Sequence, residues 1–148
     1  FMYASGDADS EMTLEGNREG VSQMFMPVSI AEPWVIFNPM LSNVFLIKGS
    51  YTIKPFAFLG GDFFNNILVI LDGTAFFRST TGAISDSTYL DPDSESPYIG
   101  TEIDLIINMR PLSDLGLSLR TGIFIPGMEL NPSKDLEFLA ELEISLSF

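Results

Sequence analysis

The sequence contains no cysteine and no histidine among its 148 residues. Without cysteine the chain can form no disulfide bond and has no thiol nucleophile, and zinc loses its commonest ligands. No serine lies in a nucleophile-elbow motif either, so the usual hydrolase schemes lack their parts. We therefore expect a protein that is not an enzyme and that needs no cofactor.

Basic residues are also scarce. Seven Lys and Arg stand against twenty Asp and Glu, which gives a formal net charge of −13. A chain this acidic is repelled by the phosphate backbone, which argues against nucleic acid as a partner.

Long apolar runs are missing, although 46% of the residues are hydrophobic. The longest aliphatic run is Ile67 to Leu71, far short of the roughly 18–20 residues that a membrane-spanning helix needs. The chain also begins at Phe1, without an initiator Met or a signal peptide. Its hydrophobicity is instead spread over short alternating stretches.

The clearest of these stretches is the last, Leu136 to Phe148, in which every even position is apolar. Leu136, Leu139 and Ala140 would share one face of a helix, but Glu143 interrupts that stripe. A period of two is typical of a β-strand with one apolar and one polar face. The stretch is longer than the usual five or six residues and suits a tilted transmembrane strand of about 9–11.

This terminal pattern resembles the last strand of bacterial outer-membrane β-barrel proteins. Leu142, Ile144, Leu146 and Phe148 match the motif that the barrel-assembly machinery reads in that family. Residues 3–7 are also similar to strand ends of alginate-export-like porin barrels. The resemblance implies an all-β, antiparallel, up-and-down transmembrane barrel in the outer membrane of a Gram-negative-type envelope, in contact with its lipid.

Similar alternation predicts about six strands in all. They lie near residues 1–6, 44–56, 67–79, 98–110, 115–125 and 136–148. The connections at 7–43 and 80–97 are long, that at 126–135 is a medium loop of the same length as the turn region 57–66, and that at 111–114 is a tight turn. If the last strand ends on the periplasmic side, the connections at 7–43, 80–97 and 126–135 are outer loops and those at 57–66 and 111–114 are periplasmic turns, and we expect the long outer loops and short turns of such barrels. The Phe-rich stretch 56–64 and Phe148 would then form one aromatic girdle.

Six strands are too few to close a membrane barrel, for which about eight is the minimum. We interpret residues 1–148 as one β-barrel domain or, preferably, as the C-terminal segment of a larger barrel. Residues 21–43 leave two alternatives open. They could supply extra strands, including a hairpin that completes a small barrel, or an inward-folded loop.

The strand faces differ sharply in polarity. The apolar rows, which we expect to face lipid, contain Ile99, Ile103, Leu105, Ile107, Leu115, Leu117, Leu119, Ile123 and the apolar residues of 136–148. The predicted pore-lining residues are Lys48, Lys54, Asp72, Arg78, Glu102, Asp104, Asn108, Arg110, Arg120, Glu137, Glu141 and Glu143. Paired carboxylates could also serve acid–base catalysis, but lining a wet lumen is the simpler interpretation. Such a lumen predicts a porin-like channel for passive or substrate-biased passage of small solutes.

Two outer loops repeat the spacing D-x-D-x-E, at Asp7, Asp9 and Glu11 and at Asp91, Asp93 and Glu95. Oxygen ligands at alternate positions suit Ca²⁺, although the full EF-hand pattern is absent. Two other functions remain open. A small closed outer-membrane barrel could act through its acidic surface loops in adhesion or as a structural protein. A soluble exported β-barrel could bind a ligand inside.

Overall fold

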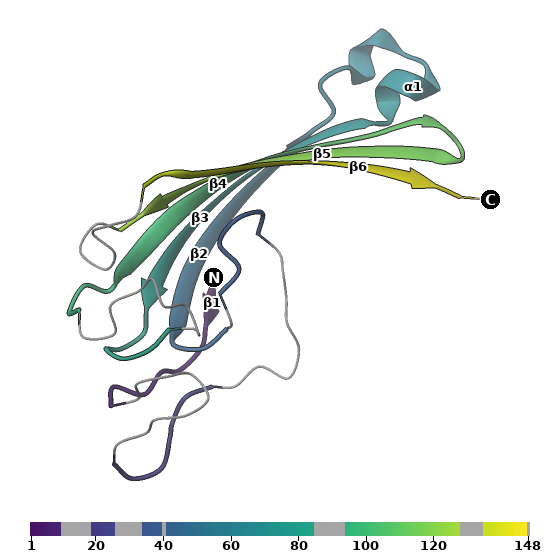
Figure 1. The fold of residues 1–148 in the computed structure, drawn as a ribbon. Helices are drawn as coiled ribbons and strands as arrows, with labels where there is room; N and C mark the ends of the chain where they lie inside the picture. The colour runs from purple at the N-terminus through teal and green to yellow at the C-terminus, as the bar shows by residue number, and fades with distance from the viewer. Residues whose placement is uncertain (10–18, 26–33, 40, 85–93, 128–134, 148) are drawn as a thin grey trace.

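The computed structural model describes residues 1–9, 19–25, 34–39, 41–84, 94–127 and 135–147. They form one six-stranded antiparallel sheet in which each strand pairs with the next in sequence (Figure 1). The prediction of an all-β, antiparallel, up-and-down sheet of six strands is therefore confirmed. Within the described residues β1 and β6 are not paired, so the sheet is open. No helix in this part of the chain is long and apolar enough to cross a membrane.

The strands are long. They are β1 (Met2–Tyr3), β2 (Val44–Ile53), β3 (Ile67–Arg78), β4 (Tyr98–Leu112), β5 (Leu115–Pro126) and β6 (Glu137–Leu146). Apart from β1, each has 10 to 15 residues, about twice the usual length of a strand in a globular protein. This length matches the long alternating stretches of the sequence.

The β2–β3 and β4–β5 connections lie at one end of the strands, here called the turn end, because consecutive strands run in opposite directions. The other connections lie at the opposite end, here called the loop end. The β2–β3 connection, residues 54–66, is longer than the β5–β6 connection, residues 127–136, so the expected difference in length between the two ends does not hold for this pair. Between β2 and β3 the chain forms a 3-10 helix, Ala57–Leu59, and a short helix, α1, Asp62–Asn65, instead of one tight reversal. Between β4 and β5 the strand continues past Arg110 to Leu112, so only Ser113 and Asp114 make the turn.

The register separates two faces of the sheet. The face that carries Lys48, Asp72 and Glu102 is here called the inner face, and the face that carries Ile47, Leu71 and Leu105 the outer face. Because side chains alternate along each strand, every charged residue of β2 to β6 falls on the inner face.

A small hydrophobic core lies on the inner face near the loop end. It consists of Trp34, Val44, Leu46, Phe76, Ile84, Ile99 and Phe124. The ring of Phe37 stacks on Phe124 at 4.7 Å and meets Phe76 edge-on at 5.0 Å, while Trp34 meets Phe76 at 5.3 Å. Residues 34–37, here called the inward segment, therefore fold against the sheet. The described parts of residues 21–43 contain no strand, which favours the inward-folded alternative.

The expectation that Ile99 faces lipid is wrong. Its side chain is fully buried and belongs to the inner core. The register between β3 and β4 shifts between Phe76 and Phe77. Gly100 pairs with Phe76 and Tyr98 pairs with Phe77, so Ile99 is an extra residue without a partner on β3. A β-bulge of this kind breaks the strict alternation of side chains at one position.

Asn43 connects three chain segments at the loop end. It is fully buried and adopts a left-handed backbone conformation with φ of 53°. Its Nδ2 donates to the carbonyl oxygens of Thr80 at 3.1 Å and Ala83 at 3.0 Å, and its Oδ1 accepts from the Thr80 amide at 3.0 Å. A Cβ on Gly6 would lie 2.0 Å from Asn43 Oδ1, so only glycine fits there.

Replacing Asn43 with alanine should loosen the loop end. The change removes the side-chain hydrogen bonds to Thr80, Gly82 and Ala83, and it places at positive φ an alanine, which adopts this conformation less readily than asparagine does, at a cost of roughly 2–4 kcal/mol. Hydrogen exchange at the Thr80 amide should accelerate accordingly. Asn38→Ala, at an exposed position, is the matched control. Equal exchange at Thr80 in both variants would contradict this role of Asn43.

Candidate functional site

The predicted pore-lining residues share one face of the sheet. Successive rows of register partners run across it, from Lys48 through Thr74, Glu102 and Phe124 to Glu137. The remaining members fall on the same side by strand alternation, and Lys54 follows directly after β2. Their shared face follows from the geometry, while their role in a pore stays a prediction.

The middle of the inner face carries a charged cluster. Lys48 Nζ lies 2.8 Å from Asp72 Oδ2, and the hydroxyl of Ser50 donates to Asp72 Oδ1 at 2.5 Å. Asp72 pairs in register with Asp104, which is 1% exposed. Asp72 thus has a cation and a hydroxyl beside it, whereas Asp104 Oδ1 has no hydrogen-bond partner among the described residues.

Glu102 holds the inward segment. Its side chain is fully buried. One carboxylate oxygen accepts the backbone N–H groups of Val35 at 2.7 Å and Ile36 at 2.9 Å, and the other accepts that of Phe37 at 2.7 Å. Three charge-assisted hydrogen bonds to consecutive amides fix the segment against β4. Glu102 is therefore an anchor beneath the segment, not a charge in contact with solvent.

The inner face of the sheet leaves room for the inward segment at Gly122 on β5. A Cβ on Gly122 would lie 2.7 Å from Asp104 Oδ1 and 3.0 Å from Val35 Cβ. Glycine on β5 therefore makes room for both the buried carboxylate and the inward segment. The fit explains why the segment lies over β4 and β5.

The remaining cations have different surroundings. Arg78 is 5% exposed, and its guanidinium donates to the carbonyl oxygens of Ser96 and Gly82, which ties the connection after β3 to the strand end. Arg120 lies 3.8 Å from Glu141, with both side chains partly exposed. Lys54 and Arg110 have no ion-pair partner within the described residues.

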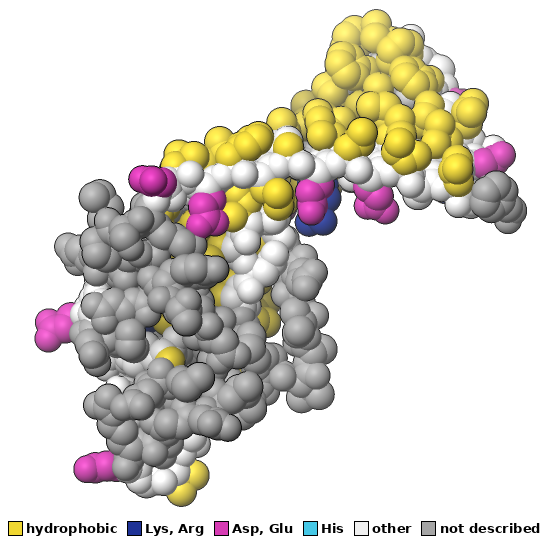
Figure 2. Space-filling view, viewed as in Figure 1, with side chains coloured by type: hydrophobic (Ala, Val, Ile, Leu, Met, Phe, Trp, Pro, Cys, Tyr) yellow, Lys and Arg dark blue, Asp and Glu magenta, His cyan; other side chains and the backbone are white. Residues whose placement is uncertain are grey.

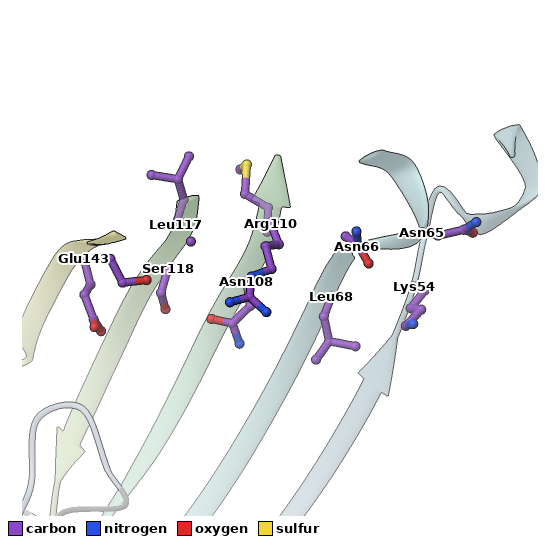
Figure 3. Close-up of a pocket in the computed structure, with 12 residues that line it drawn as sticks. Lys54, Asn65, Asn66, Leu68, Asn108, Arg110, Leu117, Ser118 and Glu143 are labelled. Carbon is purple, nitrogen blue, oxygen red and sulfur yellow. The ribbon is translucent and has the colours of Figure 1, made fainter. Parts of the chain in front are cut away.

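A hollow of about 510 Å³ opens on the inner face at the turn end. Asn108, Arg110, Ser118 and Glu143 point to its side of the sheet, and Leu117 points away from it (Figure 3). Lys54, Asn65 and Asn66 close the side near β2 and α1. The inner face is thus filled by the inward segment at the loop end and hollow at the turn end.

The outer face is apolar and uncovered. Exposed fractions reach 51% for Ile47, 48% for Leu71 and 69% for Leu142. Figure 2 shows hydrophobic side chains along one surface of the sheet and acidic ones beneath it. Of the residues that match the assembly motif, Leu142, Ile144 and Leu146 lie exposed on the outer side of β6. Phe148 lies outside the described residues.

Aromatic residues border this outer face at both ends. Near the loop end, Phe77 lies between Phe45 at 6.0 Å and Tyr98 at 5.6 Å, measured between ring centroids. At the turn end the exposed rings of Phe56, Phe58, Phe63 and Phe64 are carried by the two short helices and the residue before them. The apolar rows of the strands lie between these two aromatic bands.

The proposed calcium ligands are only partly placed, because Glu11, Asp91 and Asp93 lie outside the described residues. Asp7 accepts from the Gln23 amide at 2.8 Å, and Asp9 accepts from the Glu19 amide at 2.8 Å. A hydrogen bond between the two carboxyl groups lowers the pKa of Asp7 and raises the pKa of Asp9. The described residues contain no group of three such side chains that could hold a metal, and the calcium site stays a prediction.

Sequence reasoning left the inward segment undecided, and with it the role of Glu102. The only local signal is the apolar run Trp34 to Phe37 between Pro33 and Pro39. Such a run fits a strand and a buried loop equally well.

Comparison of the chain with protein-family models, with curated proteins and with solved structures finds no match.

Proposed function

We propose that this sheet is part of the wall of an outer-membrane β-barrel channel of the porin-like kind, through which small solutes pass. The observation that carries the proposal is the division of the sheet: all charged residues of β2 to β6 lie on the inner face, and the outer face is exposed and apolar. The terminal strand motif, which resembles that of outer-membrane barrels, supports the same assignment.

The extent of the outer face favours lipid as its neighbour. Soluble monomers rarely expose a contiguous apolar patch of more than a few hundred Å². Here the apolar rows of all the long strands adjoin each other through the register, for example Ile53, Val69, Ile107, Leu119 and Leu142. In a bilayer these rows would contact acyl chains and need no other cover.

The height of the apolar rows also fits a bilayer. From Ile67 to Phe77, β3 advances ten residues, which corresponds to about 33 Å along the strand. At the tilt usual for membrane barrels this gives an apolar band of about 25 Å. The aromatic bands at the two ends would then lie at the two interfaces, as girdles do in this architecture.

The polar character of the inner face favours a channel for polar solutes. Its ionisable side chains would make a wet, charged path, and the inward segment would narrow that path at the loop end. Since six strands do not close a barrel, we propose that further strands complete the wall between the edge strands β1 and β6.

Reconstitution tests the proposal. The protein should be found in the membrane fraction, require detergent for extraction, and produce discrete ion-conducting steps in a planar lipid bilayer. A control preparation treated identically but lacking the protein should give none. Recovery of a soluble, monodisperse protein without detergent would contradict the assignment and favour an exported ligand-binding β-barrel.

A second function is favoured by the aromatic core on the inner face. Phe37, Phe76 and Phe124 already fill part of the interior. In a narrow barrel this packing would block passage, and the protein would act through its acidic outer loops in adhesion or as a structural element. Stable membrane insertion without any conductance is the result expected from that function.

A further inference from the structure

We propose that the hollow at the turn end of the inner face binds an oxyanion, a phosphate or carboxylate group of a small solute, between Lys54 and Arg110. This inference rests on the proposed channel and adds to it the class of solute that the lumen favours. It depends on how charge is distributed along the inner face, which differs from the strongly acidic character of the whole chain.

Three acids of the inner face have partners of their own outside the hollow. Asp72 is neutralised by Lys48 at 2.8 Å. Glu102 is buried, and both its oxygens are occupied by backbone N–H groups of the inward segment. Arg120 and Glu141 face each other at 3.8 Å.

Lys54 and Arg110 differ from the other cations of the inner face. Both are exposed, and neither forms an ion pair within the described residues. They approach the hollow from the end of β2 and from β4, which are separated by β3. Strand spacing places their Cα atoms roughly 12 Å apart, so the two long side chains can reach one group held between them.

The other side chains around the hollow supply hydrogen-bond donors. Asn66 and Asn108 lie beside Arg110, and Ser118 lies on the next strand (Figure 3). An arginine guanidinium can donate two parallel hydrogen bonds to an oxyanion, and a lysine ammonium adds a point charge. Amide and hydroxyl donors complete the set that a phosphate or carboxylate prefers.

Among the residues that the structure describes, Glu143 on β6 is the only acidic side chain that lines the hollow, and it lies on the side opposite Lys54. In the register Glu143 pairs with Ser118, which pairs with Asn108 on β4. Two strand spacings, about 10 Å, therefore separate it from β4, and four, about 20 Å, separate it from the end of β2 that carries Lys54. The hollow has a basic side and an acidic side, which orients a bound anion toward β2 and β4.

Equilibrium dialysis with radiolabelled inorganic phosphate tests the site on the native protein purified in detergent. Wild-type protein should bind phosphate saturably. Lys54→Gln and Arg110→Gln should each weaken binding about tenfold, because each removes one charge-assisted interaction. Arg120→Gln is the matched control, since it removes one positive charge from the same face at a cation that already has a partner.

Conductance of the same variants separates this inference from the proposed function. Phosphate should reduce the chloride current of the wild type, and this block should require about tenfold more phosphate in Lys54→Gln and Arg110→Gln. Equal weakening of phosphate binding in all three variants would overturn the site in favour of a net-charge effect. Conductance with no saturable phosphate binding would overturn the site alone, whereas phosphate binding without conductance would overturn the channel alone.

Discussion

Replacing Leu105 with arginine should prevent stable insertion of the sheet into a lipid bilayer. Leu105 lies at the middle of β4, on the outer face, and 38% of its side chain is exposed. In a membrane barrel this position would lie near the midplane, where an arginine facing lipid costs about 2–4 kcal/mol. The fraction of chain that becomes protease-resistant after folding into phosphatidylcholine vesicles measures the effect.

The neighbouring residue supplies a matched control. Ile106 follows Leu105 on the same strand, and its side chain falls on the inner face, where Arg120 is its register partner. Ile106→Arg adds the same charge to the same strand but places it in the lumen, so the chain should still insert. Equal insertion of Leu105→Arg and Ile106→Arg would contradict the assignment of the outer face to lipid.

The strands were predictable because their alternation is a local property. From Ile47 to Ile53 and from Glu137 to Leu146, polar residues largely alternate with apolar ones, and a period of two can be recognised without knowledge of the partners. The connection at 111–114 is too short for the crossover that parallel strands need, so the antiparallel order of its two strands follows from sequence as well.

The local sequence pattern gives a wrong prediction where pairing with a neighbouring strand determines which face a side chain takes or where a strand ends. Ile99 belongs to the apolar row of its own stretch, yet the register shift opposite Phe76 and Phe77 turns it into the inner core. Likewise Pro111 suggests the start of a turn, but β4 continues to Leu112. Its pairing register with β5 shifts between Met109 and Leu112. A bulge depends on how two strands match, and neither strand alone encodes it.

The candidate site was predictable as a face but not as a set of contacts. Lys48, Asp72 and Arg110 were recognised because polar residues alternate with apolar ones. The hydrogen bonds of Glu102 join residues that are 65 to 67 positions apart in the sequence. The donors are backbone N–H groups, which every residue except proline has, so the sequence does not indicate which ones bind the carboxylate. From sequence alone, Glu102→Gln should assemble normally and change only ion preference.

The structure changes that expectation, and Glu102→Gln should release the inward segment. Glutamine keeps one oxygen for the amides of Val35 and Ile36, but its NH₂ group faces the Phe37 N–H, so two donors oppose each other. Losing that bond and the charge that strengthens the others costs roughly 2–3 kcal/mol. Trp34 is the only tryptophan and is 2% exposed, so its emission should shift to the red as the segment leaves the sheet.

Glu141→Gln is the control for this change. It removes the same charge from the same face, but its side chain is 52% exposed and faces Arg120 at 3.8 Å. Trp34 emission should therefore stay as in the wild type, while single-channel conductance should rise in Glu102→Gln alone, because the segment no longer narrows the lumen. Unchanged Trp34 emission in Glu102→Gln would mean that the packing of Phe37 on Phe76 and Phe124 holds the segment without the carboxylate.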